Sequence, residues 1–575
     1  MDDLPVLIER LKQMKVAEII DEAVGAHHLW EGMSKGLTSL VWLAHIMMTG
    51  DHRKVHVRRM LNGCRESLSK VLGLEVRESE FNDDRLARIL QALGQKEHAE
   101  EIERKMNAHC IRYYELKSDK AVARIDTTSV SVHGSADGSG MIGYGYSKDH
   151  RPDLMQFKVL MTTLDPLGLP LVTQMVAGNA SDDGLYGPAY DEAAKSIGTD
   201  VMVVGDSKMS ALGTRAHIQG RGGRYITPLG MLGKVPEQLD EWVTAALNGT
   251  VRVDALKSEA GETIGRAYEL TREQAQTNEK GEKTEWIERV IVAQSDDYAD
   301  SQERGLRERV QTTQQAIAAL TAQTGRGHHA YRSADKLQAA CQQLIEQRHV
   351  AGLLDVEIKP EHQMHEVHKR PGRPAKDARP DILEAVRFVI QKVAVNQSEL
   401  GQRIARLGWR VYVTNATSKQ WPLRAVIMAY RGEWRIEHGF HLLKGGALSI
   451  APVYLTKTDH IRGLLCLLSL AVRALTLIPF SVGQALQKAG EKIKGISAAY
   501  PHQITDHPSV ALILGAFKTI NVAFIQHAGQ RIVHVPALNS IQQKLLALLG
   551  LPPDLYTRLA SSDYSANLPL SFSER

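Results

Sequence analysis

Up to about residue 115, apolar residues recur at intervals of three and four positions, the period of helices that bury one face. Asn82 or Asp83 stands where a helix N-cap is expected, and Gly94 follows the last apolar position of the same segment. Residues 1–115 are therefore predicted to form an all-helical N-terminal domain. The segments with this period are LPVLIERLKQMKVAEIIDEAV (4–24), LTSLVWLAHIMM (37–48) and FNDDRLARILQALG (81–94).

The period shortens to two at about residue 120, where β-branched residues begin to alternate with other types. Three such strands follow one another closely, which predicts an antiparallel meander. A helix and further short apolar strands come next, so residues 116–232 are predicted to form an α/β unit with a sheet of mixed direction. The strand segments are KAVARIDTTSVSVHG (120–134), QFKVLMTTL (156–164), LPLVTQMVAG (169–178), DVMVVGDSKM (200–209) and GRYITPL (223–229).

The α/β pattern breaks over residues 233–405, which are predicted to be an insertion. It contains two hairpin strands within 252–295, a long helix over 301–322, and the basic linker KRPGRPAKDARP at 369–380. The strand GWRVYVTNA then resumes the α/β unit, whose second part is expected over residues 406–480. Residues 481–575 are rich in Leu and Ala and are predicted to be helical.

Composition narrows the class of protein only slightly. The 575 residues carry a formal net charge of +4, which allows a local nucleic-acid surface without demanding one. The four cysteines are widely spaced, and the N-terminus MDDLPVLIERLK does not resemble a signal peptide, so a reduced cytoplasmic protein is expected. The apolar run at 464–472 is short for a bilayer span and predicts a buried helix, with no membrane partner.

The stretch YRGEWRIEHGFHLLK (430–444) carries Tyr430, Glu437 and Lys444 at seven-residue steps. Seven residues are nearly two helical turns, so a continuous helix would place these side chains along one face. Apolar residues of the same stretch repeat at four and three positions on another face, which predicts packing against a core. A charged and aromatic stripe would then lie beside the buried face.

Three carboxylates lie at positions where functional residues are expected. Asp126 lies in the middle of the first predicted strand, Asp206 ends an apolar strand, and Glu437 belongs to the predicted helix. If the two strands pair side by side, their carboxylates become neighbours, and a helix packed on the sheet could add the third. Such a group suits hard divalent cations, and two such ions about 4 Å apart can promote phosphoryl transfer.

The motifs ARIDTT, VVGDSK and YRGEWRIEHGFHLLK, in this order, resemble those of the DDE transposases of bacterial insertion sequences. The resemblance implies an RNase H-like catalytic core interrupted by a β-rich insertion between Asp206 and Glu437. The family's helix signature is Tyr, two residues, Arg, three residues, Glu, six residues, Lys. Tyr430, Glu437 and Lys444 fit this signature, whereas Glu433 occupies the arginine position.

By this resemblance, Asp126, Asp206 and Glu437 would bind two Mg²⁺ or Mn²⁺ ions and direct phosphodiester hydrolysis at the element ends. Each freed 3′-OH would attack the opposite strand or target DNA, so a homodimer or higher assembly is expected to hold two ends together. Side chains of the signature helix would contact DNA; Trp434 would stack on an unpaired base or, alternatively, pack against the insertion. These DNA-contacting candidates are Tyr430, Trp434, Arg435 and Lys444.

The helical domain of residues 1–115 resembles the one that precedes the catalytic core in this family, and with the insertion it is expected to bind the terminal inverted repeats. Two basic segments outside the core are further candidates for binding double-stranded DNA. KRPGRPAK resembles an AT-hook, in which Arg373 would enter the minor groove, although a flexible basic linker explains the same composition. The cluster of Arg53, Lys54, Arg58 and Arg59 is either a phosphate-contacting patch or a solvated helix end. Two rival functions share these features: a nuclease that never joins strands, and an inactive or domesticated DNA-binding repressor.

Overall fold

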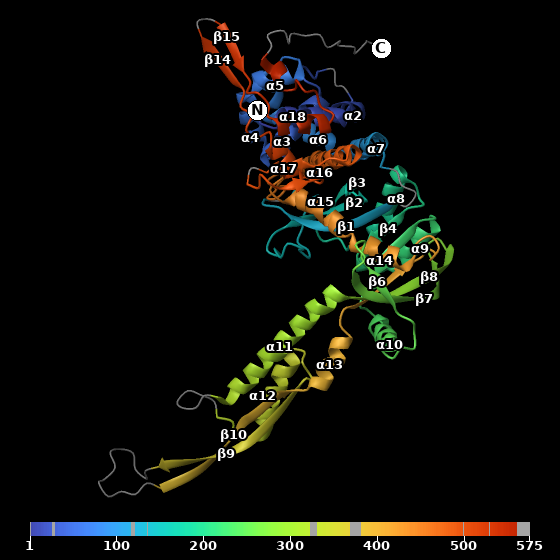
Figure 1. The fold of residues 1–575 in the computed structure, drawn as a ribbon, viewed down its shortest axis with the longest axis vertical. Helices are drawn as coiled ribbons and strands as arrows, with labels where there is room; N and C mark the ends of the chain where they lie inside the picture. The colour runs from blue at the N-terminus through green and yellow to red at the C-terminus, as the bar shows by residue number, and fades with distance from the viewer. Residues whose placement is uncertain are drawn as a thin grey trace, which may run out of the picture.

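The computed structural model describes residues 2–25, 29–116, 121–134, 136–322, 330–367, 381–497, 499–527 and 530–560. The molecule is elongated, with a helical body at one end, a large twisted sheet in the middle and an arm at the other end (Figure 1). The helical body joins the two ends of the chain: the Tyr556 hydroxyl donates to the carbonyl of Asp2 at 2.6 Å.

The N-terminal part is helical, as predicted. The Asn82 side chain accepts a hydrogen bond from the backbone of Arg85 and so begins its helix as an N-cap. The helices are α1 (Leu4–Gln13), α2 (Val16–Val24), α3 (Lys35–Thr49), α4 (Lys54–Gly63), α5 (Arg65–Leu72), η1 (Glu78–Phe81), α6 (Asp83–Leu93) and α7 (Lys96–Tyr113).

A nine-stranded sheet of mixed direction forms the middle of the molecule, in the order β3-β2-β1-β4-β5-β11-β8-β7-β6. The pairs β1–β4 and β4–β5 are parallel, and the remaining neighbours are antiparallel. The predicted meander and mixed sheet are therefore confirmed. The strands are β1 (Val122–Ser131), β2 (Gln156–Leu164), β3 (Leu169–Ala177), β4 (Met202–Gly205), β5 (Arg224–Pro228), β6 (Asp254–Lys257), β7 (Thr263–Thr277), β8 (Lys283–Ser295) and β11 (Trp409–Thr414).

The predicted insertion contributes to two different bodies. Its first strands, β6 to β8, continue the central sheet beyond β11, and α14 packs on this part through a cluster that contains Val426, Ile427 and Tyr430. The helices attached to the sheet are α8 (Tyr186–Ile197), η2 (Ser207–Ser210), α9 (Leu212–Gly220), α10 (Val235–Leu247), α14 (Leu423–Arg431) and α15 (Trp434–Lys444).

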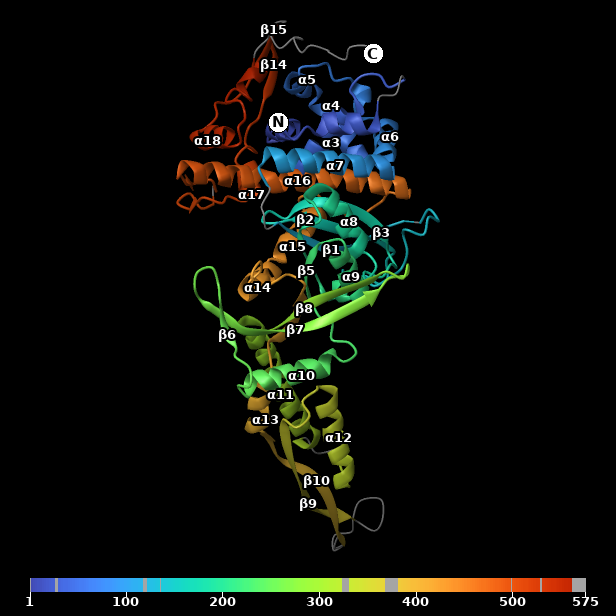
Figure 2. The ribbon, with the colours of Figure 1, turned by 90° about the vertical axis from the view of Figure 1, so that its right-hand side faces the viewer.

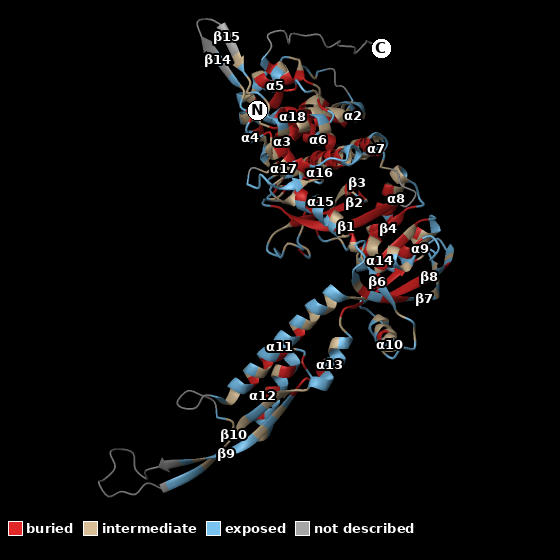
Figure 3. Cartoon of the chain, viewed as in Figure 1, coloured by how far each residue is buried: buried red, intermediate tan, exposed pale blue. Residues whose placement is uncertain are grey.

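The rest of the insertion is the arm, which has a small hydrophobic core of its own that includes Leu306, Ile317 and Leu337. Many of the arm's residues are exposed (Figure 3). Its hairpin was not predicted, because charged residues and Pro360 interrupt any alternating pattern. Residues 369–380, with Arg373, lie outside the described residues. The arm consists of α11 (Asp296–Ala322), α12 (Ala334–Gln347), β9 (Leu354–Val367), β10 (Asp381–Val395) and α13 (Gln397–Ala405).

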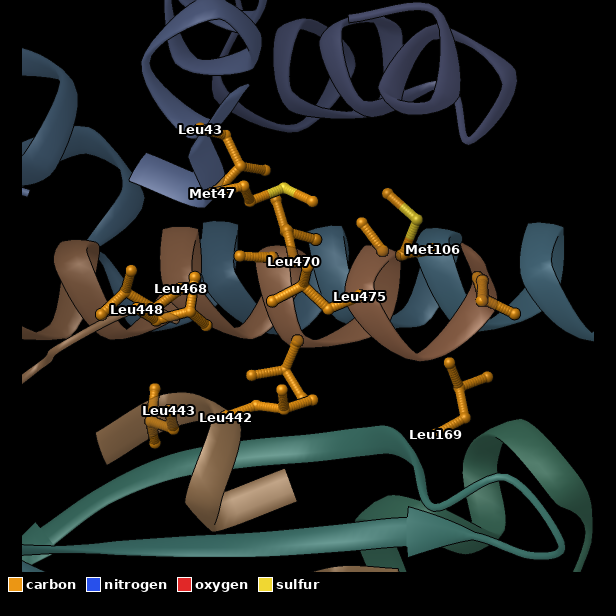
Figure 4. Close-up of a cluster of buried hydrophobic side chains, with 14 of the residues drawn as sticks. Leu43, Met47, Met106, Leu169, Leu442, Leu443, Leu448, Leu468, Leu470 and Leu475 are labelled. Atoms are coloured by element: carbon orange, nitrogen blue, oxygen red, sulfur yellow. The ribbon is translucent and has the colours of Figure 1, made fainter. Parts of the chain in front are cut away.

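Helix α16 (Thr458–Ala489) lies between the N-terminal helices and the sheet. Leu468, Leu470 and Leu475 of α16 lie in a cluster that includes Leu43 on α3 and Leu169 on β3 (Figure 4). At 32 residues, this is the one described helix long and apolar enough to cross a membrane. The sequence-based argument that its apolar run is too short for a bilayer span was therefore wrong. The prediction of a buried helix is confirmed, since 89% of its most apolar window is buried inside the protein.

The C-terminal part mixes short strands with helices, so the prediction of a helical region is wrong for the strand segments. Residues such as VAFIQ and RIVHV are rich in β-branched types, which favour a hairpin over a helix. The β14–β15 hairpin stands at the end of the molecule opposite the arm (Figure 2). The elements are β12 (Ile493–Lys494), β13 (Ile504–Thr505), α17 (Val510–Gly515), β14 (Ala523–His527), β15 (Gln530–His534), α18 (Ser540–Leu548) and η3 (Thr557–Ala560).

Candidate active site

The parallel pairing of β1 with β4 brings the first two candidate carboxylates together. The pairing register ends at Ile125 opposite Gly205, and Asp126 and Asp206 are the next residues on their strands. The prediction that these strands are neighbours is confirmed. Both aspartates thus lie at one point of the sheet, where β4 ends and β1 continues.

Asp126 is held among polar groups beneath the surface. Its carboxylate accepts from the backbone amide of Thr127 at 2.7 Å and from the Lys148 ammonium at 3.2 Å. Burial raises the pKa of Asp126; the Lys148 charge and the Thr127 amide oppose this rise, and the negative charge of Asp206 adds to it. The site therefore disfavours the accumulation of negative charge unless a cation is present.

Asp206 is oriented by its own short helix and by one buried phenol. Its side chain caps η2 by accepting from the amide of Lys208 at 2.9 Å, and the Tyr186 hydroxyl donates to the same oxygen at 2.5 Å. Burial, and then the neighbouring carboxylates, raise the pKa of Tyr186 well above its usual range, so the phenol remains a donor. These contacts fix the Asp206 carboxylate in one orientation.

The signature stretch is not one continuous helix, which corrects the sequence prediction. Helix α14 ends at Arg431 and α15 begins at Trp434, so Tyr430 lies on a different helix from Glu437. The buried Arg124 guanidinium donates to the carbonyl of Ala429 at 2.6 Å near the end of α14. Gly432 fits against this guanidinium, since an added Cβ would lie 2.3 Å from Arg124 Nη2.

Glu433 stands at the junction of α14 and α15, directly before the first residue of α15. Glu433 is half-buried; burial raises its pKa, and the charges of Asp126, Glu437 and Asp206 raise it further. Glu437, the predicted third ligand, is an exposed residue on α15. Glu433 is therefore a fourth acidic residue that is affected by the charges of the three expected ones.

Among the described residues, no group of three or more His, Cys, Asp or Glu side chains lies close enough to hold a metal ion. The donor set nevertheless suits one, because oxygen ligands from carboxylates are those that Mg²⁺ and Mn²⁺ prefer. The Lys148 ammonium at Asp126 shows that this carboxylate attracts a cation in the present arrangement. Asp126 and Asp206, with Glu437, are the residues that would hold an ion.

The predicted DNA-contacting residues of the signature stretch differ widely in exposure. Tyr430 is buried, its ring centroid 4.7 Å from that of Tyr412, and it lines a cavity of ≈ 380 Å³ between α14 and the sheet extension. Trp434 is 60% exposed, and the Arg435 guanidinium lies 5.0 Å from its ring centroid. Arg435 also donates to the carbonyl of Pro166 at 3.0 Å.

Lys444 lies against the sheet next to the aspartates. Its ammonium donates to Thr128 Oγ1 at 3.2 Å and to the carbonyl of Ser129 at 2.9 Å, and it forms an ion pair with Asp149. Asp149 belongs to the connection between β1 and β2. The lysine is therefore placed beside the site but is already paired in this arrangement.

The basic cluster of the N-terminal domain is partly neutralised within the protein. Arg53 forms a two-pronged contact with Asp51, and Lys54 pairs with Asp83 at 2.8 Å. Both basic residues line a cavity of ≈ 390 Å³ that Tyr454 also lines. The remaining two members of the predicted patch, Arg58 and Arg59, are exposed on α4.

Sequence reasoning missed the residues that connect the site across the fold. Lys148, Tyr186 and Arg124 contact the candidate carboxylates or their supporting helices, yet none belongs to a recognisable spacing. The one available signal was the segment GYSKDHRPDLMQF (145–157), which contains Lys148 and also resembles the DDE transposases. These contacts depend on residues far apart in the chain.

The site joins two acidic residues that follow one another across paired parallel strands of a mixed sheet. The family model described as "Transposase DDE domain" matches residues 117–473, which is more than half of the chain. The chain therefore belongs to the DDE transposase family. Curated protein sequences yield no match.

Among solved structures, the chain is similar to piggyBac transposase in a synaptic complex with hairpin DNA. The identity is 10% and the TM-score 0.25, over 51% of this chain and 61% of that chain. The chain thus spans less than two thirds of that transposase, and a likeness of this size supports no conclusion about the site.

Proposed function

We propose that this transposase binds the terminal inverted repeats of an insertion sequence, cuts the element ends by metal-dependent hydrolysis and joins the 3′-OH ends to target DNA. The RNase H-like description of the core belongs to the same proposal. Its strongest support is the parallel register of β1 and β4, which makes Asp126 and Asp206 neighbours. The family match over residues 117–473 agrees with this reading of the site.

Two divalent ions, Mg²⁺ or Mn²⁺, would supply the charge stabilisation that phosphodiester hydrolysis and strand transfer need. In this proposal Asp126, Asp206 and Glu437 hold them. Tyr186 keeps Asp206 oriented by its hydrogen bond, and burial of Asp126 strengthens its attraction for a cation. Because Glu437 is exposed, it can approach the aspartates when a cation offsets their repulsion.

The DNA-binding surface is proposed to include the exposed Trp434, together with Arg435, Lys444 and the exposed arginines of α4. Tyr430 would act through the cavity that it lines, since its side chain is buried. Two element ends have to be held together for paired cutting, which favours a homodimer or higher assembly. The corresponding localisation is the cytoplasm, where the enzyme would associate with the nucleoid when it is bound to DNA.

The test is cleavage of end-labelled DNA that carries the element's terminal inverted repeat, in the presence of Mg²⁺. Wild type is compared with Glu437→Gln and with Glu433→Gln, which removes a neighbouring charge of the same type. The proposal expects cutting at the element end by wild type, and binding without cutting by Glu437→Gln. Loss of cutting only in Glu433→Gln would transfer the third ligand position to Glu433.

Two other results would favour the rival functions. If wild type cuts but never joins a 3′-OH end to a supplied target duplex, a nuclease that does not transfer strands is the better description. If wild type binds the repeat but fails to cut it when either Mg²⁺ or Mn²⁺ is supplied, a DNA-binding repressor is favoured.

A further inference from the structure

The connection between β1 and β2 lies across the candidate site and carries two adjacent residues of opposite charge. Lys148 donates to the carbonyl of Thr127 at 2.6 Å, to Thr127 Oγ1 at 3.1 Å and to Asp126 at 3.2 Å. The next residue, Asp149, forms an ion pair with Lys444 on α15. One short segment therefore engages a candidate metal ligand and a candidate DNA-binding lysine.

The backbone of this segment is anchored independently of the Lys148 ammonium. The Lys148 amide donates to Ser129 Oγ at 3.2 Å, and the Gln156 side chain donates to the carbonyl of Tyr146 at 2.8 Å. The long side chain of Lys148 can therefore change its partner while its backbone stays attached to the sheet. About a third of that side chain, 32%, is exposed to solvent.

A divalent cation at Asp126 and the Lys148 ammonium cannot share the same carboxylate without mutual repulsion. Cation binding at Asp126 therefore favours the departure of the Lys148 ammonium. The nearest anion that a transposase offers a displaced ammonium is the backbone of the DNA strand being cut, and lysine binds phosphate well as a point charge. After displacement, the positive charge of Lys148 would thus face the substrate instead of Asp126.

We propose that Lys148 is a substrate-binding residue of this active site, which pairs with Asp126 in the free protein and contacts the DNA phosphate beside the cleaved bond once a divalent cation is bound. This inference rests on the proposed function, because the phosphate is that of the cut strand. Lys148 then links metal binding to DNA binding: each favours the state in which the ammonium has left Asp126.

The first part of the test measures metal binding without DNA. Mn²⁺ is titrated into wild type, Lys148→Gln and the control Arg151→Gln, and free Mn²⁺ is read by electron paramagnetic resonance. Arg151 lies on the same segment but pairs with Asp153 at 2.7 Å, not with a candidate metal ligand. Lys148→Gln should bind Mn²⁺ about three- to fivefold more tightly, because one partly exposed charge contact no longer competes. The control should match wild type.

The second part measures DNA binding and DNA cleavage in the presence of saturating Mg²⁺. Lys148→Gln should lower the slope of log K against log salt by about 0.9, as expected for one lost phosphate contact. Its cleavage rate should fall at least about tenfold, the effect of losing a charged hydrogen bond. Lys148→Arg, which keeps the charge, should preserve the salt slope.

Unchanged Mn²⁺ affinity in Lys148→Gln would overturn the proposal, because Lys148 would then not compete with the metal. Tighter Mn²⁺ binding with an unchanged salt slope and undiminished cleavage would also overturn it, since Lys148 would only block the site. If wild type itself fails to cleave, the proposed function fails, whereas Mn²⁺ affinity and the salt slope still decide the role of Lys148.

Discussion

The guanidinium of Arg124, on β1, donates to the carbonyl of Ala429, on α14, at 2.6 Å. The same group forms a two-pronged contact with Asp165, in the turn after β2, and is almost completely buried. Arg124 precedes Asp126 by two residues, so one side chain fixes the junction of α14 and α15 relative to the strand that carries the first carboxylate. The position of Glu433 and Glu437 depends on this contact.

Removal of Arg124 should destabilise the protein strongly. Arg124→Gln leaves Asp165 with only the more distant Arg435, 3.7 Å away, and removal of one partner of a buried pair typically costs about 3–5 kcal/mol. Urea unfolding followed by circular dichroism measures the loss. In the double variant Arg124→Gln/Asp165→Asn, part of the stability should return, because no uncompensated carboxylate remains. A loss below about 1 kcal/mol in the single variant would show that the contact does not hold the junction.

Substitution of Gly432 should impair cleavage more than folding. In Gly432→Ala the new methyl group would lie 2.0 Å from Arg435 Nη1 and 2.3 Å from Arg124 Nη2, so both side chains have to shift. A shift of the helix junction misplaces the carboxylates, and cleavage should fall at least about tenfold. Gly446→Ala is the control, since its added Cβ would have no neighbour within 4 Å. Equal rates in the two variants would contradict this role of Gly432.

Lys444 and Asp149 should affect DNA binding in opposite directions. Lys444→Gln removes a positive charge beside the site and should lower the salt slope of DNA binding by about 1. Asp149→Asn breaks the ion pair and frees Lys444, so binding should strengthen about two- to fivefold. Fluorescence anisotropy over a salt series measures both. Weaker binding by Asp149→Asn would mean that the ion pair positions the lysine for DNA.

The stability of the protein should decrease as pH rises from about 4.5 to about 7 because of Glu103. Burial raises the pKa of Glu103 from 4.5 to about 7, although Arg473 lies 3.4 Å away and opposes the shift. The folded state therefore binds the proton more tightly than the unfolded state, and the free energy of unfolding falls by up to about 3 kcal/mol between these values.

Glu103→Gln should remove this decrease, which urea unfolding at pH 5 and pH 8 can measure. Glu101→Gln on the same helix is the control. Arg104 lowers the pKa of the partly exposed Glu101, so its contribution has the opposite sign. A pH profile of Glu103→Gln identical to that of wild type would contradict the assignment.

Much of the fold follows from local periodicity. The three- and four-residue repeat of the first hundred residues predicts the helices that the structure contains, and the alternation around Asp126 predicts β1. Asp206 at the end of a short apolar strand was recognisable as a candidate for the same reason. These features depend on interactions between near neighbours, which the order of residues specifies directly.

The tertiary structure decided how those elements meet. Apolar spacing within 430–444 predicts one helix, but the helix is interrupted at Gly432, which lies against the guanidinium of Arg124, distant in sequence. The pairing of Lys148 with Asp126 likewise carries no sequence pattern, since a loop places it. Periodicity reports which face of an element is apolar. Contacts between charged side chains from different elements depend on how those faces pack, and only the folded chain determines that.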